Sequence, residues 1–487
     1  KEEIDLLSEG KAYAAQPDSM AALVLKYGKL LLDKPNYLSV HAAGILISED
    51  PIYNYTATFL PPKGFPTTHF DMVVAEDIGL YKFDILGQRG LAKIKEAMEI
   101  IAYNQPDTNT FDIHDICSLK ADPQINQMVK SGQCMGCFYV ESPAMRMLMA
   151  KLQVDNYLGL VAASSIIRPG VAQSGMMREY ILRHRDPERR KQAHPVLMDI
   201  MPDTYGVMVY QEDVIKVAHH FAGLSLGEAD VLRRGMSGKY RSREEFQRVE
   251  ETFISNCRAK GYDEKTILDV WNQIASFAGY AFAKGHSASY AVESYQSMFL
   301  RQYYPLEFFT AVLNNGGGFY RPEIYIHEAG MLGAKVEVPC INQSALECRI
   351  VGEVIYLGLC FLSGLETMVA ERLVKERQRN GIFESFEDFL DRVAIGIEQV
   401  SILVRINAFR FTGVDKYELL WQAHFKLGHI KRYEAQYQLF KPKQRSFTLP
   451  VLETTQLEAA FDQIELLGFS LCSPFELLVE QPNTPWG

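Results

Sequence analysis

The spacing of apolar residues divides the chain into a helical start, a strand-rich stretch and a long helical body. Residues 1–33 carry leucines and alanines at helical spacing, and Pro35 ends this piece. Between residues 37 and 88, β-branched and aromatic residues alternate with turn signals, which predicts strands at "YLSVHAAGILIS", "ATFLPP", "THFDMVV" and "LYKFDIL". The first part of the chain is therefore expected to hold a small sheet.

From Arg89 to about Gly316 the pattern is almost wholly helical. Within "RGLAKIKEAMEIIAY" the spacing predicts one apolar stripe made of Leu91, Ile94, Met98 and Ile101. The stretch "NNGGGFYRPE", residues 314–323, breaks the pattern and is a candidate hinge. A small α/β stretch follows, then two helices around "LSGLETMVAERLVKERQRNG", a basic linker over residues 430–448 and a final amphipathic helix.

Length and composition predict a large soluble protein. At about 100–200 residues per domain, 487 residues correspond to three or four domains. Hydrophobic residues make up 47% and charged residues 23%, and no apolar run is long enough to span a bilayer. The chain has no signal peptide, and its eight cysteines are scattered, so we expect reduced thiols in the cytoplasm. The single C-x-x-C pair, Cys134 and Cys137, has no second ligand pair nearby, which favours packed thiols over zinc.

Positive charge is clustered although the net charge is -10. The clusters are "RHRDPERRKQAH" (183–194), "RRGMSGKYRSR" (233–243) and "KLGHIKRYEAQYQLFKPKQR" (426–445). Any one of them could be a solvated surface, but three in one chain make this less favoured for the set, and the net charge does not exclude a large enzyme with one basic groove.

The stretch "LYKFDILG" places two opposite charges inside an apolar strand. Apolar residues alternate around Lys82 and Asp84, so both side chains point to the same face of the strand. A structural salt bridge is one interpretation. The other is a metal-binding carboxylate, since magnesium takes hard oxygen ligands together with substrate phosphates.

Three further stretches suggest sites for anions or bases. Arg168 precedes a Pro-Gly turn that is followed by Ser174 and Gly175, an arrangement that can cradle an anion or form a plain turn. Arg233 and Arg234 stand together before "GMSGK", and at least one must project outward, with Lys239 and Arg241 just beyond. In the third stretch, aromatic residues interleave with Lys284 and His286, which suits base stacking or a plain aromatic core.

Taken together, these stretches resemble the catalytic alpha subunit of bacterial DNA polymerase III, the C family of polymerases. The matching motifs, in the family's order, are "HAAGILIS", "YKFDILGQRG", "FYVESPAMRMLM", "RPGVAQSGM", "YGVMVYQEDV", "GEADVLRRGM", "FAGYAFAKGHSASYAVESYQ" and "YYPLEFF". The resemblance covers nearly the whole chain.

The resemblance implies a two-magnesium nucleotidyl transfer on primer-template DNA, with deoxynucleoside triphosphates as substrates. It makes Asp84 similar to the third metal-binding aspartate of the palm and Lys82 similar to the lysine beside it. It places Arg168, Ser174, Gly175, Arg233, Arg234, Lys284 and His286 around the incoming triphosphate. Lys239 and Arg241 are expected to contact DNA.

The chain departs from the family at the motif "PDxDxDF", which supplies the first two aspartates and is not found here. The PHP domain and the Gly-Ser-rich nucleotide loop are also not found, so we expect a fragment that binds DNA but does not polymerise alone. The expected fold is mainly α with a small mixed α/β palm remnant and several domains. The expected domains are a thumb remnant (1–33), the C-terminal part of the palm (34–88), fingers (89–330), a helix-hairpin-helix region that begins the clamp-binding part (331–430), and a clamp-binding linker with a terminal helix (431–487).

Beyond the fingers, "LSGLET" resembles a helix-hairpin-helix turn that keeps Gly364 but has Glu366 where a second glycine is usual. The resemblance also implies a sliding clamp and other replicase subunits as partners. A clamp-binding peptide of the pattern Gln-x-x-Leu-Phe is expected at Gln436, Leu439 and Phe440. The alternative is a non-catalytic module that binds nucleic acid and the clamp.

Overall fold

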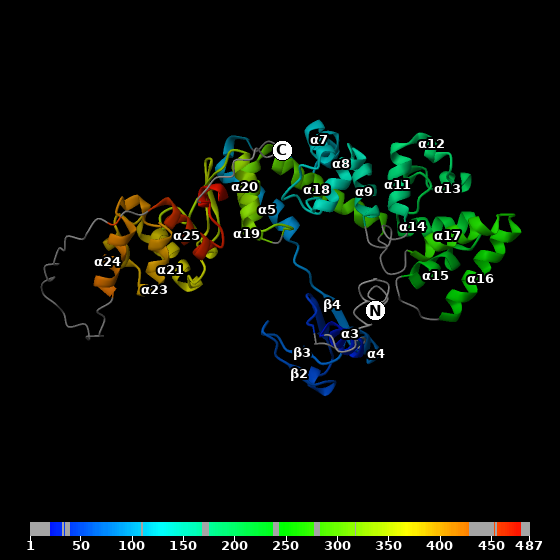
Figure 1. Ribbon diagram of the computed structural model, residues 1–487, viewed down its shortest axis with the longest axis horizontal. Coiled ribbons are helices and arrows are strands. Elements are labelled where there is room, and N and C mark those ends of the chain that lie inside the picture. Colours follow the sequence, from blue (N-terminus) through cyan, green and yellow to red (C-terminus); the bar gives the residue numbers. More distant parts are fainter. Residues whose placement is uncertain are drawn as a thin grey trace. The chain divides into compact units, whose positions relative to one another are not determined.

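The protein is described here by a computed structural model that covers residues 20–31, 34, 39–108, 111–167, 175–236, 243–276, 283–316, 318–427, 452 and 455–478 (Figure 1). The chain forms two compact units, Lys1–Gln88 and Arg89–Gly487. Each unit is considered by itself.

The described residues of the first unit form two small sheets and two helices. Its elements are α3 (Met20–Leu31), β1 (Gly44–Ile47), the 3-10 turn η1 (Ile52–Asn54), β2 (Thr58–Phe59), β3 (Thr67–Thr68), α4 (Met72–Asp77) and β4 (Tyr81–Asp84). Strands β1 and β4 pair antiparallel, and so do β2 and β3. Gly44 stands opposite Asp84, and Leu46 stands opposite Lys82.

The predicted strand "THFDMVV" is wrong in its second half. Only Thr67 and Thr68 are in β3, and helix α4 starts at Met72. The reason is local, because the carboxylate of Asp71 accepts a hydrogen bond from the backbone N–H of Val74 at 3.0 Å. An aspartate in this position caps a helix and offers the backbone an alternative to a strand ladder.

One face of the β1–β4 pair is apolar and open to solvent. Ile45 and Ile47 of β1 and Tyr81 and Phe83 of β4 are all about half exposed or more, between 49% and 65%. The other face carries Gly44, Leu46, Lys82 and Asp84, because directly paired residues point to the same side. The two faces therefore differ completely in chemistry.

The second unit begins with a helical body. Its helices up to the predicted breaker are α5 (Arg89–Asn104), α6 (Ile116–Ala121), α7 (Pro123–Ser131), α8 (Pro143–Leu152), α9 (Tyr157–Ile166), α11 (Met176–Arg185), α12 (Pro187–Arg190), α13 (Pro195–Ile200), α14 (Gln211–Lys216), α15 (Leu226–Met236), α16 (Arg243–Ala259), α17 (Glu264–Ser276), α18 (Lys284–Tyr303) and α19 (Pro305–Asn315). Short 3-10 turns are η2 (Pro106–Thr108) and η3 (Pro202–Thr204), and η4 (Val217–Phe221) is a π-helical turn.

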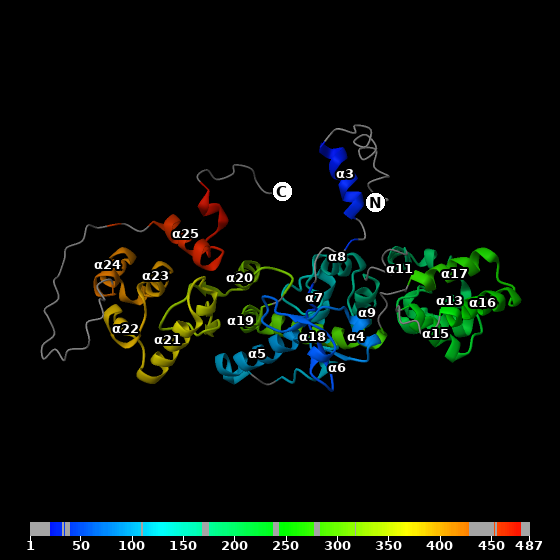
Figure 2. The same ribbon diagram turned by 90° about the horizontal axis from the view of Figure 1, so that it is seen from below.

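Helix α18 is central to this body. It contacts α5, α6, α7, α9 and α19, and both views show it among these helices (Figures 1 and 2). Tyr295 and Met298 on α18 are fully buried. The predicted helical body between Arg89 and Gly316 is thus confirmed.

The apolar stripe predicted on α5 is only partly correct. Ile94 and Ile101 are buried, whereas Leu91 is 48% exposed and Lys93 is buried in its place. Burial lowers the pKa of Lys93, and the nearby Glu141 opposes that shift. Spacing alone cannot place a lysine inside, because its charge must be met by a partner that lies far away in the sequence.

In the sequence, the breaker near residue 316 lies between this body and the remaining elements, of which α20 and the following small sheet pack in the same core as the body. The remaining elements are α20 (Pro322–Met331), β5 (Lys335–Glu337), β6 (Arg349–Val351), β7 (Val354–Tyr356), η5 (Leu359–Phe361), α21 (Thr367–Asn380), α22 (Phe386–Arg392), α23 (Ile397–Arg405), η6 (Arg410–Thr412), α24 (Lys416–Leu427), α25 (Gln456–Leu467) and η7 (Pro474–Leu477). Strand β7 lies between β5, to which it is parallel, and β6, to which it is antiparallel. Helices α21 to α25 share a core that includes Leu373, Phe389, Leu403 and Phe409. The prediction of a mainly α, multi-domain chain with a small α/β part is confirmed.

Candidate functional site

Asp84 and Lys82 form a close ion pair at the end of strand β4. The Lys82 ammonium lies 2.7 Å from Asp84 Oδ1 and 2.8 Å from Oδ2, so it binds both carboxylate oxygens. The hydrogen bond from Lys82 lowers the pKa of Asp84. The Asp84 side chain is 46% exposed while the Lys82 side chain is 15% exposed, so the acid is open to solvent and the lysine stem is mostly buried. An ionised, accessible carboxylate is the form that binds a divalent cation.

The donor set around Asp84 suits one oxygen ligand of a magnesium ion but not a complete site. Asp84 supplies a hard carboxylate, and His41 Nδ1 lies 3.8 Å from its Oδ1. In the part of the chain that the structure describes, no group of three or more His, Cys, Asp or Glu residues could hold a metal ion. Two magnesium ions would therefore need further ligands beyond Asp84.

The adjacent arginines of α15 share one acid. Arg233 Nε lies 2.8 Å from Asp230 Oδ1, and Arg234 Nε lies 2.9 Å from Asp230 Oδ2. Ser225 caps this helix together with Glu228, since Glu228 N–H donates to Ser225 Oγ and Ser225 N–H donates to Glu228. Arg233 and Arg234 are 32% and 49% exposed, so both remain accessible to an anion.

Lys284 and His286 stand in the first turn of α18. The backbone N–H of Lys284 donates to both oxygens of Glu212, at 3.0 and 2.9 Å, although 72 residues separate them. The Lys284 ammonium lies 3.7 Å from Asp203 and 5.2 Å from the Tyr210 ring centroid. The ring centroid of His286 lies 4.0 Å from that of Tyr290, with the two rings tilted by 47°. The structure thus brings Lys284 and His286 together with the motif "YGVMVYQEDV", a link that the sequence did not predict.

Several predicted site residues lie outside the described residues. They are Arg168, Ser174, Lys239, Arg241, Gln436, Leu439 and Phe440. Gly175 is described, and it starts helix α11 with a φ of 82°, which favours glycine.

The first turn of α5 is tightly enclosed by two other predicted motifs. A Cβ at Gly90 would lie 2.2 Å from Glu293 Oε1 and 2.4 Å from Phe138 Cδ2. Burial raises the pKa of Glu293 to about 7. Gly90, Phe138 and Glu293 belong to "YKFDILGQRG", "FYVES" and "AVESYQ", so the three motifs meet here. The sequence analysis did not single out Gly90, and the only signal for it is a glycine in the first turn of a predicted helix.

Glu141 of the "FYVES" motif binds the stretch "NNGGGFYRPE", which the sequence predicts as a hinge. Its carboxylate accepts hydrogen bonds from the N–H groups of Gly136 and Phe319, both at 2.9 Å, and from the Tyr325 hydroxyl at 2.9 Å. A Cβ at Gly318 would overlap the Tyr325 hydroxyl. The described part of this breaker is therefore anchored to the helical body.

The hairpin at Gly364 is closed by a side chain and by the last helix. Gly364 has a φ of 80°, which favours glycine. Gln399 donates to the Gly364 carbonyl at 2.9 Å and accepts from the Glu366 N–H at 2.8 Å. The Ser363 N–H donates to the Leu466 carbonyl of α25 at 2.7 Å. Two backbone amides of the hairpin are thus already bonded within the protein.

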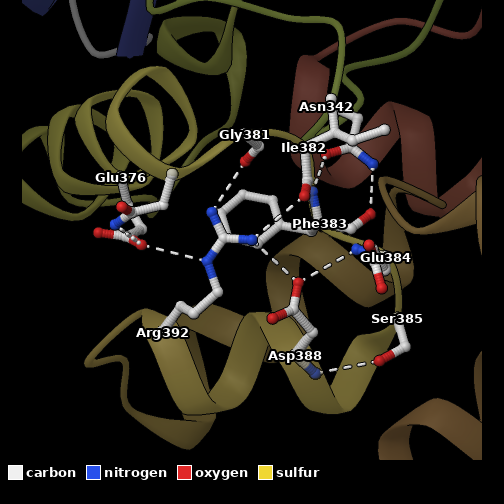
Figure 3. A network of polar contacts seen from close by, with 10 residues as sticks. Asn342, Glu376, Gly381, Ile382, Phe383, Glu384, Ser385, Asp388 and Arg392 are labelled. Atoms are coloured by element: carbon white, nitrogen blue, oxygen red, sulfur yellow. Dashed lines mark hydrogen bonds and ion pairs between the residues drawn. The ribbon is translucent and has the colours of Figure 1, made fainter.

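Helices α21 and α22 are joined by Arg392 (Figure 3). Its guanidinium donates to Glu376 at 3.1 Å, to Asp388 at 3.0 Å, and to the carbonyls of Gly381 and Ile382 at 2.8 and 3.1 Å. It also lies 4.4 Å from the Phe383 ring centroid. This network holds the end of α21 against α22. The guanidinium of Arg392 therefore stabilises the fold rather than offering its charge to a ligand.

The basic cluster at 183–194 is likewise largely used within the fold. Arg183 and Arg189 both bind Glu179, at 2.9 and 3.0 Å. Arg190 donates to the carbonyls of Arg183 and His184. This cluster therefore offers less free charge than its sequence suggests.

The C-x-x-C pair is buried. Burial raises the pKa of the Cys134 thiol to about 12 and raises that of Cys137 as well, so both stay protonated. The interpretation as packed thiols is consistent with this burial.

Comparison with known proteins places these sites in a family. Models of the bacterial DNA polymerase III alpha NTPase domain, of the bacterial DNA polymerase III alpha subunit finger domain and of the helix-hairpin-helix motif match residues 6–87, 90–261 and 333–419. Three separate segments of the chain thus match models of bacterial DNA polymerase III alpha domains or of a helix-hairpin-helix motif.

Curated relatives agree with these family models. The chain is similar to DNA polymerase III subunit alpha of Treponema pallidum (strain Nichols), with 31% identity over 480 residues, 94% of this chain and 40% of the relative. It is similar to the subunit of the same name from Aquifex aeolicus (strain VF5), with 30% identity over 457 residues, 92% of this chain and 38% of the relative. For the subunit from Thermus aquaticus the identity is 32% over 399 residues, 81% of this chain and 32% of the relative. The chain belongs to the family of bacterial DNA polymerase III alpha subunits and spans about two fifths of the length of the first two relatives.

Proposed function

We propose that this chain is part of the catalytic subunit of a cytoplasmic replicative DNA polymerase. The reaction is template-directed DNA synthesis from deoxynucleoside triphosphates. The observation that carries the proposal is the Lys82–Asp84 pair at the end of β4 in a chain of this family. The model has no helix in its described part that is long and apolar enough to cross a membrane.

In this proposal the carboxylate of Asp84 would be one of the ligands that hold magnesium. A bound magnesium ion would supply Lewis acidity toward the reacting phosphate. Lys82 keeps Asp84 ionised and would offer its ammonium to a phosphate oxygen. Both roles need the two side chains on one face of the strand, which the pairing register supports.

We assign the triphosphate to Arg168, Ser174, Gly175, Arg233, Arg234, Lys284 and His286. Arg233 and Arg234 both bind Asp230, and this contact holds two guanidinium groups near each other on one helix turn. Primer-template DNA is assigned to Lys239, Arg241 and the hairpin at Gly364. The domain names given above are part of the same proposal.

The chain by itself is proposed to bind DNA without extending it. One carboxylate cannot hold two magnesium ions. Primer extension with magnesium and four nucleotides should show no product for this chain. Extension that Asp84→Asn abolishes would contradict this and would mean that the other ligands are present in the chain.

DNA binding is expected to weaken as salt increases, because phosphate contacts release counterions. Arg233→Ala with Arg234→Ala should reduce the affinity for primer-template DNA, or nucleotide use in the complete subunit, by about tenfold. The matched control is Arg189→Ala with Arg190→Ala, another adjacent pair that the fold uses internally. If the Arg233→Ala, Arg234→Ala variant binds DNA and uses nucleotides as well as the unchanged protein does, the two arginines are not part of the site.

The second candidate function, a non-catalytic module for DNA and the sliding clamp, is favoured by the helix-hairpin-helix match. Leu439 and Phe440 would enter an apolar pocket on the clamp, with Gln436 at its edge. Titration of the clamp with this chain should give a dissociation constant on the order of micromolar. Binding should be lost in the double variant Leu439→Ala with Phe440→Ala. It should be kept in the control Leu452→Ala. Equal binding by all three chains, or by none, would show that the peptide is not the anchor.

A further inference from the structure

The imidazole of His41 is bound to the backbone that faces Asp84. His41 Nδ1 accepts hydrogen bonds from the N–H groups of Ala43, at 3.1 Å, and Gly44, at 2.6 Å. Because both partners are donors, Nδ1 carries no proton and the ring is fixed in one orientation. The side chain thereby closes the turn that leads into β1.

The two residues that bond to His41, Ala43 and Gly44, are also residues of β1 and its approach that contact the strand carrying Asp84. Gly44 is paired with Asp84 in the β1–β4 ladder. The carbonyl of Ala43 accepts the N–H of Ile85 at 3.0 Å. His41 therefore fixes the backbone opposite Asp84 and the backbone bonded to the residue after it.

Position 44 has little room for a side chain, because two other groups fill the space beside Gly44. A Cβ at this position would lie 2.9 Å from His41 Nδ1 and 3.1 Å from Lys82 Cε. The imidazole and the lysine stem thus pack over Gly44, and this places Nδ1 3.8 Å from Asp84 Oδ1. The spacing of "HAAG" follows from this contact, with the histidine three residues before the glycine.

We infer that His41 is a positioning residue for Asp84 and Lys82, an inference that rests on the proposed polymerase function for its catalytic consequence. It does not bind the metal through Nδ1, since that atom is engaged by two amides. It sets where the carboxylate and the ammonium stand when the ion and the triphosphate arrive. An error of about 1 Å in such a placement lowers rate rather than binding, by up to about 100-fold.

Three substitutions separate this role from a general need for a folded ribbon. In His41→Asn the side-chain oxygen can accept the same two N–H groups from the same distance along the chain. In His41→Gln the oxygen is placed one carbon further out, and in His41→Ala no acceptor remains. The control is His69→Ala, which removes another histidine of the same unit whose ring contact is with Phe59.

The first measurement needs no catalysis and is made on this chain. Amide hydrogen exchange at Gly44 and Ile85 should be at least tenfold faster in His41→Ala and His41→Gln than in the unchanged chain. His41→Asn and His69→Ala should stay within about threefold of it. Equal protection at Gly44 and Ile85 in all four variants would overturn the inference.

The second measurement is primer extension by a complete polymerase subunit that carries the same changes. His41→Ala should lower kcat by about 10- to 100-fold with little change in the KM for nucleotide, and His41→Asn should restore most of kcat. A kcat in His41→Asn as low as in His41→Ala would contradict positioning through Nδ1. If the unchanged subunit does not extend primers, the proposed function fails while the exchange experiment still decides the role of His41.

Discussion

Gly90 has no room for a side chain, although it lies in the second position of a helix where alanine is normally preferred. Gly90→Ala should destabilise the second unit by about 1–3 kcal/mol, because its Cβ would overlap Glu293 and Phe138. Gly285→Ala is the matched control, since Gly285 lies in the first turn of α18 with open space around its Cβ position. The control should be neutral or more stable by about 0.5–1 kcal/mol. Urea unfolding of the three chains measures both effects, and equal midpoints would refute the crowding at Gly90.

Glu293 should make stability depend on pH. Burial raises its pKa to about 7 from an ordinary value of 4.5, so the folded state binds more protons than the unfolded state between these values. The free energy of unfolding should therefore fall as pH rises from 4.5 to 7. Glu293→Gln removes this dependence and should be more stable than the unchanged chain at pH 8, by about 1–3 kcal/mol. A difference between the two chains that is the same at pH 5 and pH 8 would exclude Glu293 as the cause.

Pairs that lie close in sequence could be predicted, and pairs that lie far apart could not. The cap of α15 at Ser225 and the shared face of Lys82 and Asp84 follow from local spacing. The bond from Lys284 to Glu212 crosses 72 residues, and nothing in either stretch signals the other. His41 is an intermediate case, because its bond is local but its importance depends on a strand 40 residues further on.

At the scale of elements, the Arg392 network should decide whether α21 and α22 stay together (Figure 3). Arg392→Ala removes one donor from each of two carboxylates and two carbonyls, so we expect a loss of about 2–4 kcal/mol. Arg392→Lys should recover only part of it, because an ammonium lacks the planar fork. Arg379→Ala, at an exposed position on α21, is the control and should change stability by less than about 0.5 kcal/mol. Thermal unfolding followed by circular dichroism compares them, and a loss in Arg379→Ala equal to that in Arg392→Ala would argue against the network.

Element types were predictable where one physical signal dominated. The long helices between Arg89 and Gly316 follow from apolar period alone. Helix α4 was missed because the β-branched residues Val73 and Val74 favour a strand, whereas the single cap at Asp71 favours a helix. On α5 the buried face includes Lys93 and leaves out Leu91, which the apolar spacing had placed on it. The packing of neighbouring helices, rather than the spacing, selects the buried face.

At the scale of the whole molecule, the two units should unfold separately. The first unit has two sheets of two strands each, with short strands and apolar residues open to solvent, whereas the second has an extended core. Residues 89–487 expressed alone should keep the thermal midpoint of the second unit to within a few degrees. Calorimetry of both chains tests this, and a midpoint lowered by ten degrees or more would mean that the second unit depends on the first.

The pairing of Gly44 with Asp84 also restricts where residues can be inserted near this site during evolution. Residues alternate between the two faces of β4, so one residue inserted into this strand would turn Phe83 toward the place of the carboxylate and Asp84 toward the apolar side. Insertions in the loops between β1 and β4, outside β2, β3 and α4, leave that alternation intact and cost mainly loop entropy. Sequence drift in this region is thus free in length within these loops and fixed in length within the strands.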